Sequence, residues 1–327
     1  MSLSRAQIFQ IATLEAGRIL QRNKTNFEEP VNVFSIVEAD NIVLNFQELG
    51  NLAGAYLPSE VTGAIPGILV NENLPVTRQR YTVAHEYCHH LRKDPVSFDT
   101  SEQLFLEAYK RDERERIAET FASCLLMPRP LIVKSLQKMG ISIQNSRNQI
   151  GPMQAYSLSL RLGTSYIATI GRLLALQLIS DSQYKKLSSL SPRDMKAELG
   201  KESLESSWND IWMLSQLDHG SIIYPRQGDT IRLSLKENPT TGFKWKVSFE
   251  SEHLELLNSE WFASGNPKIG NGGERLFEFK VGEPGEMLLE LQNCRPWELE
   301  TVVDNFQVKL LIQSKRHGIS PQWLLAG

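Results

Sequence analysis

The sequence predicts a two-domain protein in which an α+β domain comes first, a helical connector follows, and an all-β sandwich comes last. The chain has 327 residues, which is too long for one typical hydrophobic core. Its first half combines apolar residues at helical spacing with two short strand-like runs. Beyond residue 220 the pattern changes to alternating apolar and polar residues with many turn-forming glycines and prolines.

The first domain is predicted to span residues 1–180. Its expected helices cover residues 4–22, 77–92, 103–126 and 152–178, and its expected strands are Ile42 to Leu44 and Ile68 to Val70. Thr77 is the expected N-cap of the second helix, and Asp94-Pro95 is expected to end it. Gly163-Thr164-Ser165 should break the last helix into two.

The remaining chain is predicted to form three further segments. Residues 181–219 read as a connector with short helices, because their apolar spacing is poor. Residues 220–313 are expected to form an antiparallel sandwich of about seven strands. Residues 314–327 are expected to form a tail in which Trp323-Leu324-Leu325 follows a polar stretch.

Composition excludes some classes of function. The net charge of −3 argues against nucleic acid as a direct partner, because phosphate binding needs a basic surface. No apolar run approaches the length of a membrane-spanning helix, and the start of the chain lacks the apolar core of a secretion signal. The three cysteines are widely separated, so we expect no disulfide framework and a cytoplasmic location.

A metal-binding motif lies in the helix predicted at 77–92. The run His85-Glu86-Tyr87-Cys88-His89 fits H-E-x-x-H, and helical spacing places His85 and His89 one turn apart on one face. The two imidazoles can bind one Zn²⁺ together, and Glu86 is placed to accept a proton from water activated by the metal. His90 and Cys88 lie off this face and are expected to have structural roles.

A catalytic zinc usually takes a third protein ligand from another element. The helix predicted at 103–126 supplies three acidic candidates, Glu113, Glu115 and Glu119. Small residues on the same helix, Ala118 and Ala122 among them, would allow it to pack closely against the histidine helix.

The run from Arg78 to His89, followed by Glu115-x-x-Ala118-Glu119 and by Phe121-Ala122-x-x-Leu125-Leu126-Met127-Pro128, resembles the ImmA/IrrE family of metallopeptidases over roughly residues 1–180. The resemblance implies a zincin-like fold with one Zn²⁺ per chain. It also implies that the third ligand is the glutamate three residues before the alanine, which is Glu115. The family usually has Asn or Asp where this chain has Glu119, so both glutamates stay candidates. We expect Ile68 to Asn71 to offer a strand edge to a peptide substrate.

Three loop motifs stand out in the second domain. The first, Asn238 to Trp245, contains Thr240, Thr241, Gly242 and Phe243 in a turn that Pro239 and Gly242 favour. The second is Gly270-Asn271-Gly272-Gly273, whose backbone can approach a partner closely. The third is Arg295-Pro296-Trp297, which combines residue types enriched at binding hot spots.

These three motifs, in this order, resemble the chagasin family of cysteine-protease inhibitors over about residues 220–312. The resemblance implies an immunoglobulin-like sandwich whose three loops line up at one end and enter the cleft of a papain-like cysteine protease. The contacts would then be Thr240, Thr241, Gly242 and Phe243, the 270–273 loop, and Arg295, Pro296 and Trp297. Trp245 is expected to lie in the core instead.

The leading hypothesis is a zinc-dependent endopeptidase that acts on a protein or peptide, with a second domain for regulation or recruitment. Relatives of the first domain act on helix-turn-helix repressors, so the resemblance implies such a repressor as one candidate substrate in a stress or mobile-element response. The alternative hypothesis is a binding protein that inhibits a papain-like cysteine protease, with a structural or inactive metal domain. A transcription factor is disfavoured because the segment around Gly163 lacks a basic cluster.

Overall fold

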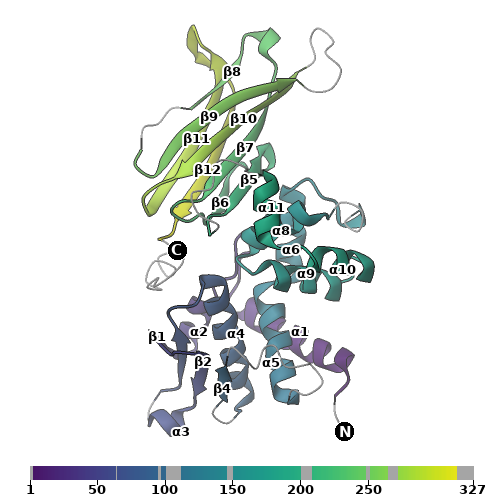
Figure 1. Ribbon diagram of the computed structural model, residues 1–327. Coiled ribbons are helices and arrows are strands. Elements are labelled where there is room, and N and C mark those ends of the chain that lie inside the picture. Colours follow the sequence, from purple (N-terminus) through teal and green to yellow (C-terminus); the bar gives the residue numbers. More distant parts are fainter. Residues whose placement is uncertain are drawn as a thin grey trace. The chain divides into compact units, whose positions relative to one another are not determined.

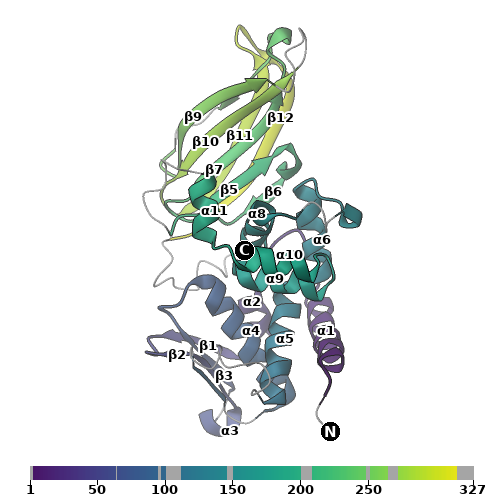
Figure 2. The same cartoon turned by 45° about the vertical axis from the view of Figure 1, so that its right-hand side comes forward.

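The structure is a computed structural model that describes residues 3–63, 65–94, 97–100, 112–145, 150–199, 208–247, 251–263 and 272–314. It divides into two units, one built mainly from residues 1–134 and 158–184 and the other from residues 135–157 and 185–315 (Figure 1). The predicted tail beyond Ser314 lies outside the described residues. Helices dominate the first unit and strands dominate the second (Figure 2).

A four-stranded sheet lies in the first unit, in the order β1-β3-β2-β4. Its strands are β1 (Val43–Gln47), β2 (Leu52–Leu57), β3 (Gly67–Asn71) and β4 (Ser97–Thr100). β3 pairs in parallel with β1 and antiparallel with β2. Ile68 and Val70 are fully buried, which suits an interior strand. The prediction that Ile68 to Asn71 offers an open edge is therefore wrong, and the edge strands of the sheet are β1 and β4.

Helices pack on this sheet, and others belong to the second unit. The helices of the described chain are α1 (Arg5–Arg22), α2 (Val33–Ala39), α3 (Ser59–Thr62), α4 (Val76–Arg92), α5 (Glu113–Leu126), α6 (Arg129–Lys138), α8 (Pro152–Leu162), α9 (Tyr166–Ala175), α10 (Asp181–Ser188) and α11 (Pro192–Leu199). α4 packs on β2 and β3 and against α5, which in turn packs against α1. The predicted break at Gly163 is confirmed, since α8 ends there and Gly163 has a positive φ of 61°.

The boundaries of α4 fix the position of the H-E-x-x-H motif. Its first turn is closed by the Pro75 carbonyl, which accepts hydrogen bonds from the N–H groups of Arg78 and Gln79 at 2.8 and 3.0 Å. The helix starts at Val76, so the prediction of Thr77 as N-cap is wrong. At the other end, Lys93 takes a left-handed conformation with φ 54° and ends the helix before Asp94, as predicted.

The second unit contains two four-stranded sheets, ordered β5-β7-β10-β9 and β6-β12-β11-β8. Their strands are β5 (Ile211–Ser215), β6 (Ser221–Ile223), β7 (Thr230–Glu237), β8 (Lys244–Val247), β9 (Leu254–Ala263), β10 (Gly273–Val281), β11 (Gly285–Arg295) and β12 (Glu298–Ile312). Most neighbours are antiparallel, as expected from the alternating pattern. The pairs β5–β7 and β6–β12 are parallel.

Alternate residues of the central strands form the core of the second unit. Leu233, Phe277, Phe279 and Phe306 are buried, and Trp245 is buried as predicted. β5 was not predicted, because Ile211 to Ser215 lies in the segment interpreted as a helical connector. Its residues pair in register with β7, from Ile211 opposite Thr230 to Ser215 opposite Ser234. The sheet β5-β7-β10-β9 of the second unit therefore begins before residue 220.

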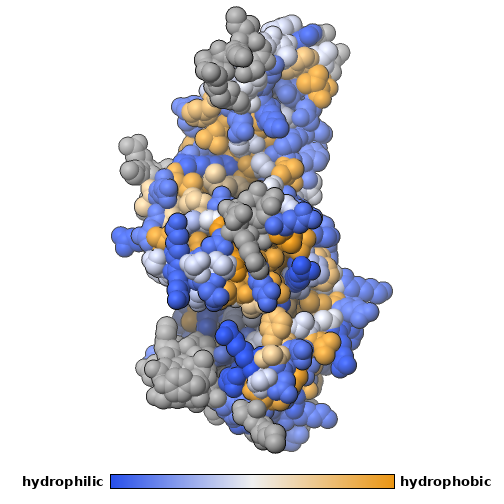
Figure 3. Space-filling view, turned by 90° about the vertical axis from the view of Figure 1, so that its right-hand side faces the viewer, coloured by the Kyte–Doolittle hydropathy of each residue, from blue (hydrophilic) through white to orange (hydrophobic). Residues whose placement is uncertain are grey.

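The surface of the described chain is mixed in polarity. Hydrophilic side chains cover much of the face shown in Figure 3, with hydrophobic side chains in scattered groups. No helix among the described residues is both long enough and apolar enough to cross a membrane.

Candidate functional site

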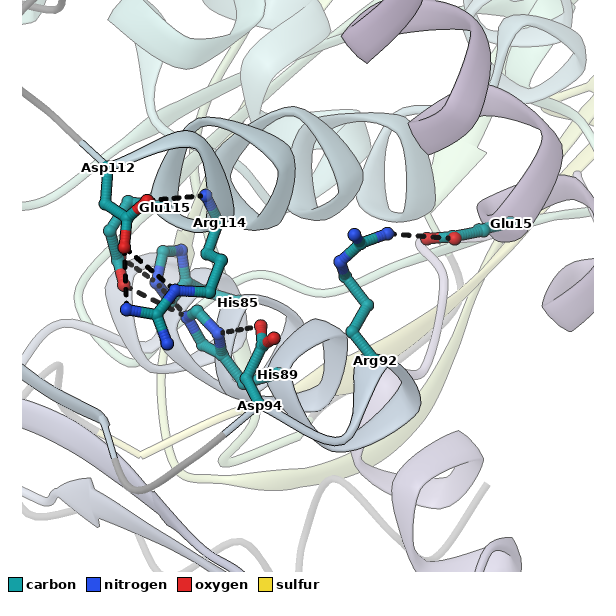
Figure 4. Close-up of polar contacts among 8 residues, drawn as sticks. All are labelled: Glu15, His85, His89, Arg92, Asp94, Asp112, Arg114 and Glu115. Carbon is teal, nitrogen blue, oxygen red and sulfur yellow. Dashed lines mark hydrogen bonds and ion pairs between the residues drawn. The ribbon is translucent and has the colours of Figure 1, made fainter. Parts of the chain in front are cut away.

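The H-E-x-x-H motif lies in the buried middle of α4. His85 and His89 are each 1% exposed, and their Nε2 atoms lie 3.2 Å apart. Figure 4 shows both imidazoles, one turn apart on the helix, pointing toward the carboxylate of Glu115. Helical periodicity alone explains this juxtaposition, as the sequence predicted.

α5 brings Glu115 to the two histidines. The Asp112 side chain caps the helix by accepting a hydrogen bond from the Arg114 N–H, and Glu115 follows in the first turn. One Glu115 oxygen lies 3.1 Å from His85 Nε2 and the other lies 3.5 Å from His89 Nε2 (Figure 4). Ala118 on the same helix is fully buried, and its small side chain suits the close packing of α5 against α4.

His85, His89 and Glu115 form a group that could hold a metal ion. One ligand atom from each residue lies within 4.8 Å of those from the other two. Glu119 lies one turn further along α5 and is not part of this group of described residues. Two imidazole nitrogens and one carboxylate suit Zn²⁺ and leave a fourth position for a reactant.

The charges around the group also favour a cation. Hydrogen bonds from His85 and His89 hold the pKa of Glu115 well below its usual range. Burial lowers the pKa of His89, but hydrogen bonds to Glu115 and Asp94, with the charge of Glu86, outweigh burial and raise it to about 9. The carboxylates thus favour positive charge at the point where the ligand atoms converge. The donor set and the local charge both fit a divalent metal.

Asp94 is a site residue that the sequence analysis missed. Its Oδ2 lies 2.9 Å from Nδ1 of His89, on the side of the ring opposite the ligand group (Figure 4). From the sequence, Asp94 marks only the end of a helix. Asp94 could have been found from the left-handed turn that is expected where a helix ends. Such a turn brings the next residue back toward the last helical turn, which here contains His89.

The neighbours of the motif have structural roles. His90 lies off the ligand group, with its Nδ1 3.2 Å from the Tyr56 hydroxyl and its ring stacked on Tyr87. Burial lowers the pKa of His90. Cys88 is fully buried, and burial raises the pKa of its thiol far above the usual range, which favours the inert thiol form. Both observations agree with the roles expected from their positions on the helix.

The first loop of the second unit is fixed by its own hydrogen bonds. The Asn238 side chain accepts from the Thr240 N–H and hydroxyl at 3.3 and 2.7 Å. The Thr241 hydroxyl donates to the Asn238 carbonyl at 2.7 Å. Gly242 closes the turn with a φ of 79°, a conformation that glycine adopts without strain.

The first and third loops touch each other. A Cβ atom at Gly242 would come within 2.9 Å of Trp297, so the indole lies directly against the glycine. The Arg295 guanidinium lies 4.7 Å from the centre of the Phe243 ring. Trp297 is nevertheless 73% exposed, and Pro296 beside it is exposed too. Trp297 is thus accessible to a partner, and one side of its indole packs against Gly242 of the first loop.

Part of the second loop can be placed beside the first. Gly270 and Asn271 lie outside the described residues. A Cβ at Gly272 would lie 3.4 Å from the Glu237 carbonyl oxygen and 3.6 Å from the Asn238 Cβ. Gly273 begins β10, where a side chain would collide with the neighbouring strand β9. The described end of this loop therefore meets the base of the first loop.

A buried ion pair that the sequence analysis also missed supports this base. Glu237 has a side-chain exposure of 0% and pairs with Arg275 through two hydrogen bonds of 2.7 and 2.8 Å. The same carboxylate accepts a hydrogen bond from the backbone N–H of Trp245 at 2.9 Å. Because Glu237 and Trp245 flank the first loop, one carboxylate connects its two ends. The partners are far apart in sequence, so no local motif marks them.

Two parts of the chain match models of known protein families. Residues 37–173 match the family model described as the IrrE N-terminal-like domain, a peptidase family. Residues 225–310 match the chagasin family of peptidase inhibitors, I42. The chain thus carries an IrrE-like region followed by a chagasin-like region. Both resemblances predicted from the sequence are confirmed.

Individual relatives cover one domain or the other. The radiation response metalloprotease IrrE of Deinococcus deserti is 35% identical over 107 residues, which are 31% of this chain and 34% of that protein. The chain therefore spans about a third of that relative's length. Chagasin of Trypanosoma cruzi is 24% identical over 89 residues, which are 26% of this chain and 81% of chagasin. Amoebiasin-2 of Entamoeba histolytica is 24% identical over 95 residues, 28% of this chain and 77% of that protein.

Solved structures similar to this chain include the cysteine protease inhibitor EhICP2 of Entamoeba histolytica, with 21% identity and a TM-score of 0.30. The match covers 32% of this chain and 96% of that one. The similarity of residues 37–173 to IrrE-like metallopeptidases implies a metal in this region. Among the described residues, His85, His89 and Glu115 are the group that could hold it.

Proposed function

We propose that the IrrE-like domain is a zinc-dependent endopeptidase with one Zn²⁺ per chain, held by His85, His89 and Glu115. The main support is the convergence of three ligand atoms within 4.8 Å where α4 packs against α5. A site of this kind leaves one position open for a reactant, which distinguishes catalytic from structural zinc sites.

Glu86 acts as the general base and then the general acid in this proposal. It follows His85 on α4 and is fully buried, and its charge contributes to the raised pKa of His89. When bound, zinc supplies a Lewis acid that polarises the peptide carbonyl and acidifies water. The Glu86 carboxylate accepts the proton of the attacking water. It then donates that proton to the amine nitrogen as the peptide C–N bond breaks.

Zinc content tests the metal site directly. The purified chain should contain one zinc per molecule by elemental analysis, and the Glu115→Ala variant should contain much less at the same total zinc. A Glu119→Ala variant serves as the matched control, because Glu119 lies on the same helix outside the ligand group. Loss of zinc in Glu119→Ala but not in Glu115→Ala would overturn the ligand assignment.

The chagasin-like domain, in the same proposal, binds a papain-like cysteine protease through its loops. The contacts are Thr240, Thr241, Gly242 and Phe243, the 270–273 loop, and Arg295, Pro296 and Trp297. The observation that supports this is the contact of Gly242 with Trp297, which presents an exposed aromatic residue on a supported turn. Inhibition of papain by the full chain, measured with a fluorogenic substrate, tests it.

Inhibition alone is the second candidate function, with the metal domain structural or inactive. The support is that internal hydrogen bonds fix the first loop, as an inhibitor that binds rigidly requires. In that case Glu86→Gln would leave every measurable function unchanged. Cleavage of any protein by the wild-type chain, lost in Glu86→Gln, would exclude this candidate.

The substrate and the finer architecture complete the proposal. A helix-turn-helix repressor is the proposed substrate class, supported by the resemblance of the first domain to ImmA/IrrE peptidases. We assign a zincin-like fold to that domain and an immunoglobulin-like sandwich to the second. The first-domain limits 1–180 and a cytoplasmic location are proposed from the sequence, and the second domain is proposed to begin ahead of β5 rather than at residue 220. Incubating the chain with candidate repressors and identifying cleavage products by mass spectrometry tests the substrate class.

A further inference from the structure

The end of α4 folds back onto one of the candidate metal ligands. Lys93 adopts φ 54° and ψ 40°, and this left-handed residue reverses the chain after the last helical turn. The Asp94 N–H then donates to the His89 carbonyl oxygen at 2.9 Å. Through the same turn the Asp94 carboxylate reaches the His89 ring, with 2.9 Å between Oδ2 and Nδ1. Asp94 therefore contacts both the backbone and the side chain of His89.

The contact between Asp94 and His89 decides which ring nitrogen of His89 is available to bind a metal. A carboxylate accepts hydrogen bonds, so Nδ1 must carry the hydrogen that it donates to Asp94. In the neutral ring Nε2 then presents its lone pair, and Nε2 is the atom that faces His85 and Glu115 at 3.2 and 3.5 Å. Burial of the ring, with 1% exposure, prevents water from replacing the carboxylate.

The two histidines differ in this respect. Nδ1 of His85 is buried and has no hydrogen-bond partner within the part of the chain that the structure describes. A carboxylate at Nδ1 is therefore seen at His89 and not at His85 in that part of the chain. His89 also lies nearer the C-terminal end of α4, which ends at Arg92.

We infer that Asp94 is a positioning residue for the metal site: it holds His89 in the Nδ1–H tautomer and aims Nε2 at the metal. The inference rests on the proposed zinc site and adds a residue to it. Hydrogen-bonded carboxylates of this type increase the basicity of a ligand imidazole and fix its ring. Asp94 touches neither substrate nor metal in this role.

A purely structural role must be distinguished from this one, because Asp94 also ends the helix. The helix end depends on the Asp94 backbone N–H and on the left-handed Lys93, and both survive a change of the Asp94 side chain. Asp94→Asn keeps an oxygen that can accept the Nδ1 hydrogen bond but lacks the charge. Lys93→Gly keeps the left-handed turn and leaves the carboxylate in place, so it is the matched control.

The experiment measures zinc affinity of the full chain by competition with a fluorescent chelator. We expect Asp94→Ala to weaken zinc binding by about 10- to 100-fold, Asp94→Asn to weaken it less, and Lys93→Gly to leave it unchanged. Equal affinity in wild type and Asp94→Ala would overturn the inference. So would equal losses in Asp94→Ala and Lys93→Gly, since these would trace the effect to the turn.

A second readout needs no metal. In the metal-free chain, long-range ¹H–¹⁵N spectra of the histidine rings should show Nδ1–H as the donor of His89 when the ring is neutral, and Asp94→Ala should change this pattern. A wild-type chain that binds no zinc but shows the Asp94-dependent pattern would refute the proposed zinc site while the orienting contact stands. An unchanged pattern in Asp94→Ala would overturn the inference even if zinc binds.

Discussion

The candidate metal ligands lie on two packed helices, whereas the residues of the candidate inhibitor face lie on loops between strands. His85 and His89 are almost completely buried, while Trp297 is 73% exposed. Helical spacing holds the histidines together, but the loops depend on glycine turns and on the Glu237–Arg275 pair. One region is therefore suited to chemistry between fixed, mostly buried side chains, and the other to contact with a second protein. The two regions should accordingly respond to different substitutions.

Substitution of Glu86 should have the largest effect and separate the two regions most clearly. Glu86→Gln is expected to reduce peptide cleavage by about 10²- to 10⁴-fold, because the amide cannot accept the proton of the attacking water. Zinc content and inhibition of papain should stay at the wild-type level. Turnover of a protein substrate followed by gel and mass spectrometry measures the loss. Wild-type turnover in Glu86→Gln would refute the assigned role.

The converse change is Trp297→Ala. An exposed tryptophan at a binding face commonly contributes about 2 kcal/mol or more, so inhibition of a papain-like protease should weaken by roughly 30-fold or more. Cleavage by the metallopeptidase domain should not change. Leu288→Ala is the control, because Leu288 on β11 is also exposed, at 52%, and belongs to none of the loops. Similar inhibition constants for Trp297→Ala and wild type would refute the proposed face.

pH should affect the metal site through His89. In the metal-free chain its pKa is raised from 6.5 to about 9, mainly by Glu115 and Asp94 against the opposing effect of burial. A raised histidine pKa stabilises the fold below pH 6.5, and this contribution disappears as the pH rises through about 9. We expect a loss of about 3 kcal/mol in the free energy of unfolding over this window.

Urea denaturation with a chelator present, at several pH values, measures this loss. The His89→Asn variant is the control and should lack the fall in stability between these pH values. Parallel behaviour of the two proteins would show that another group is responsible. Zinc binding should follow the opposite trend and strengthen as the pH rises, because the metal competes with protons for the ligand atoms.

The smallest effect is expected from the glycines of the second unit. Gly242 and Gly220 have similar positive φ values of 79° and 73°, but only Gly242 lies against another side chain, Trp297. Each alanine substitution should cost about 1 kcal/mol of stability through backbone strain. Gly242→Ala should in addition displace Trp297 and weaken inhibition, whereas Gly220→Ala should not. Equal inhibition by both variants would show that the indole position is unimportant.

Local patterns account for what could be predicted from the sequence. The helical spacing of His85 and His89, the nearby acidic helix and the order of the three loops all lie in short stretches of chain. Asp94 and the Glu237–Arg275 pair were missed because they depend on a reversal of the backbone and on pairing across a sheet. The edge prediction for β3 rested on the tendency of a strand beside an H-E-x-x-H helix to bind peptides, and a run of five residues does not show which strands pair with it.

The parallel pairing of β5 with β7 has a practical consequence for recombinant fragments. A fragment that begins at residue 220 lacks Ile211 to Ser215, so the backbone N–H and C=O groups on one side of β7 lose their partners. An open strand of this kind pairs readily with other chains and promotes aggregation. Asp210, whose N–H donates to Asp229 at 2.8 Å, extends the same contact. An inhibitor fragment intended for crystallisation or cell delivery should therefore begin ahead of Asp210.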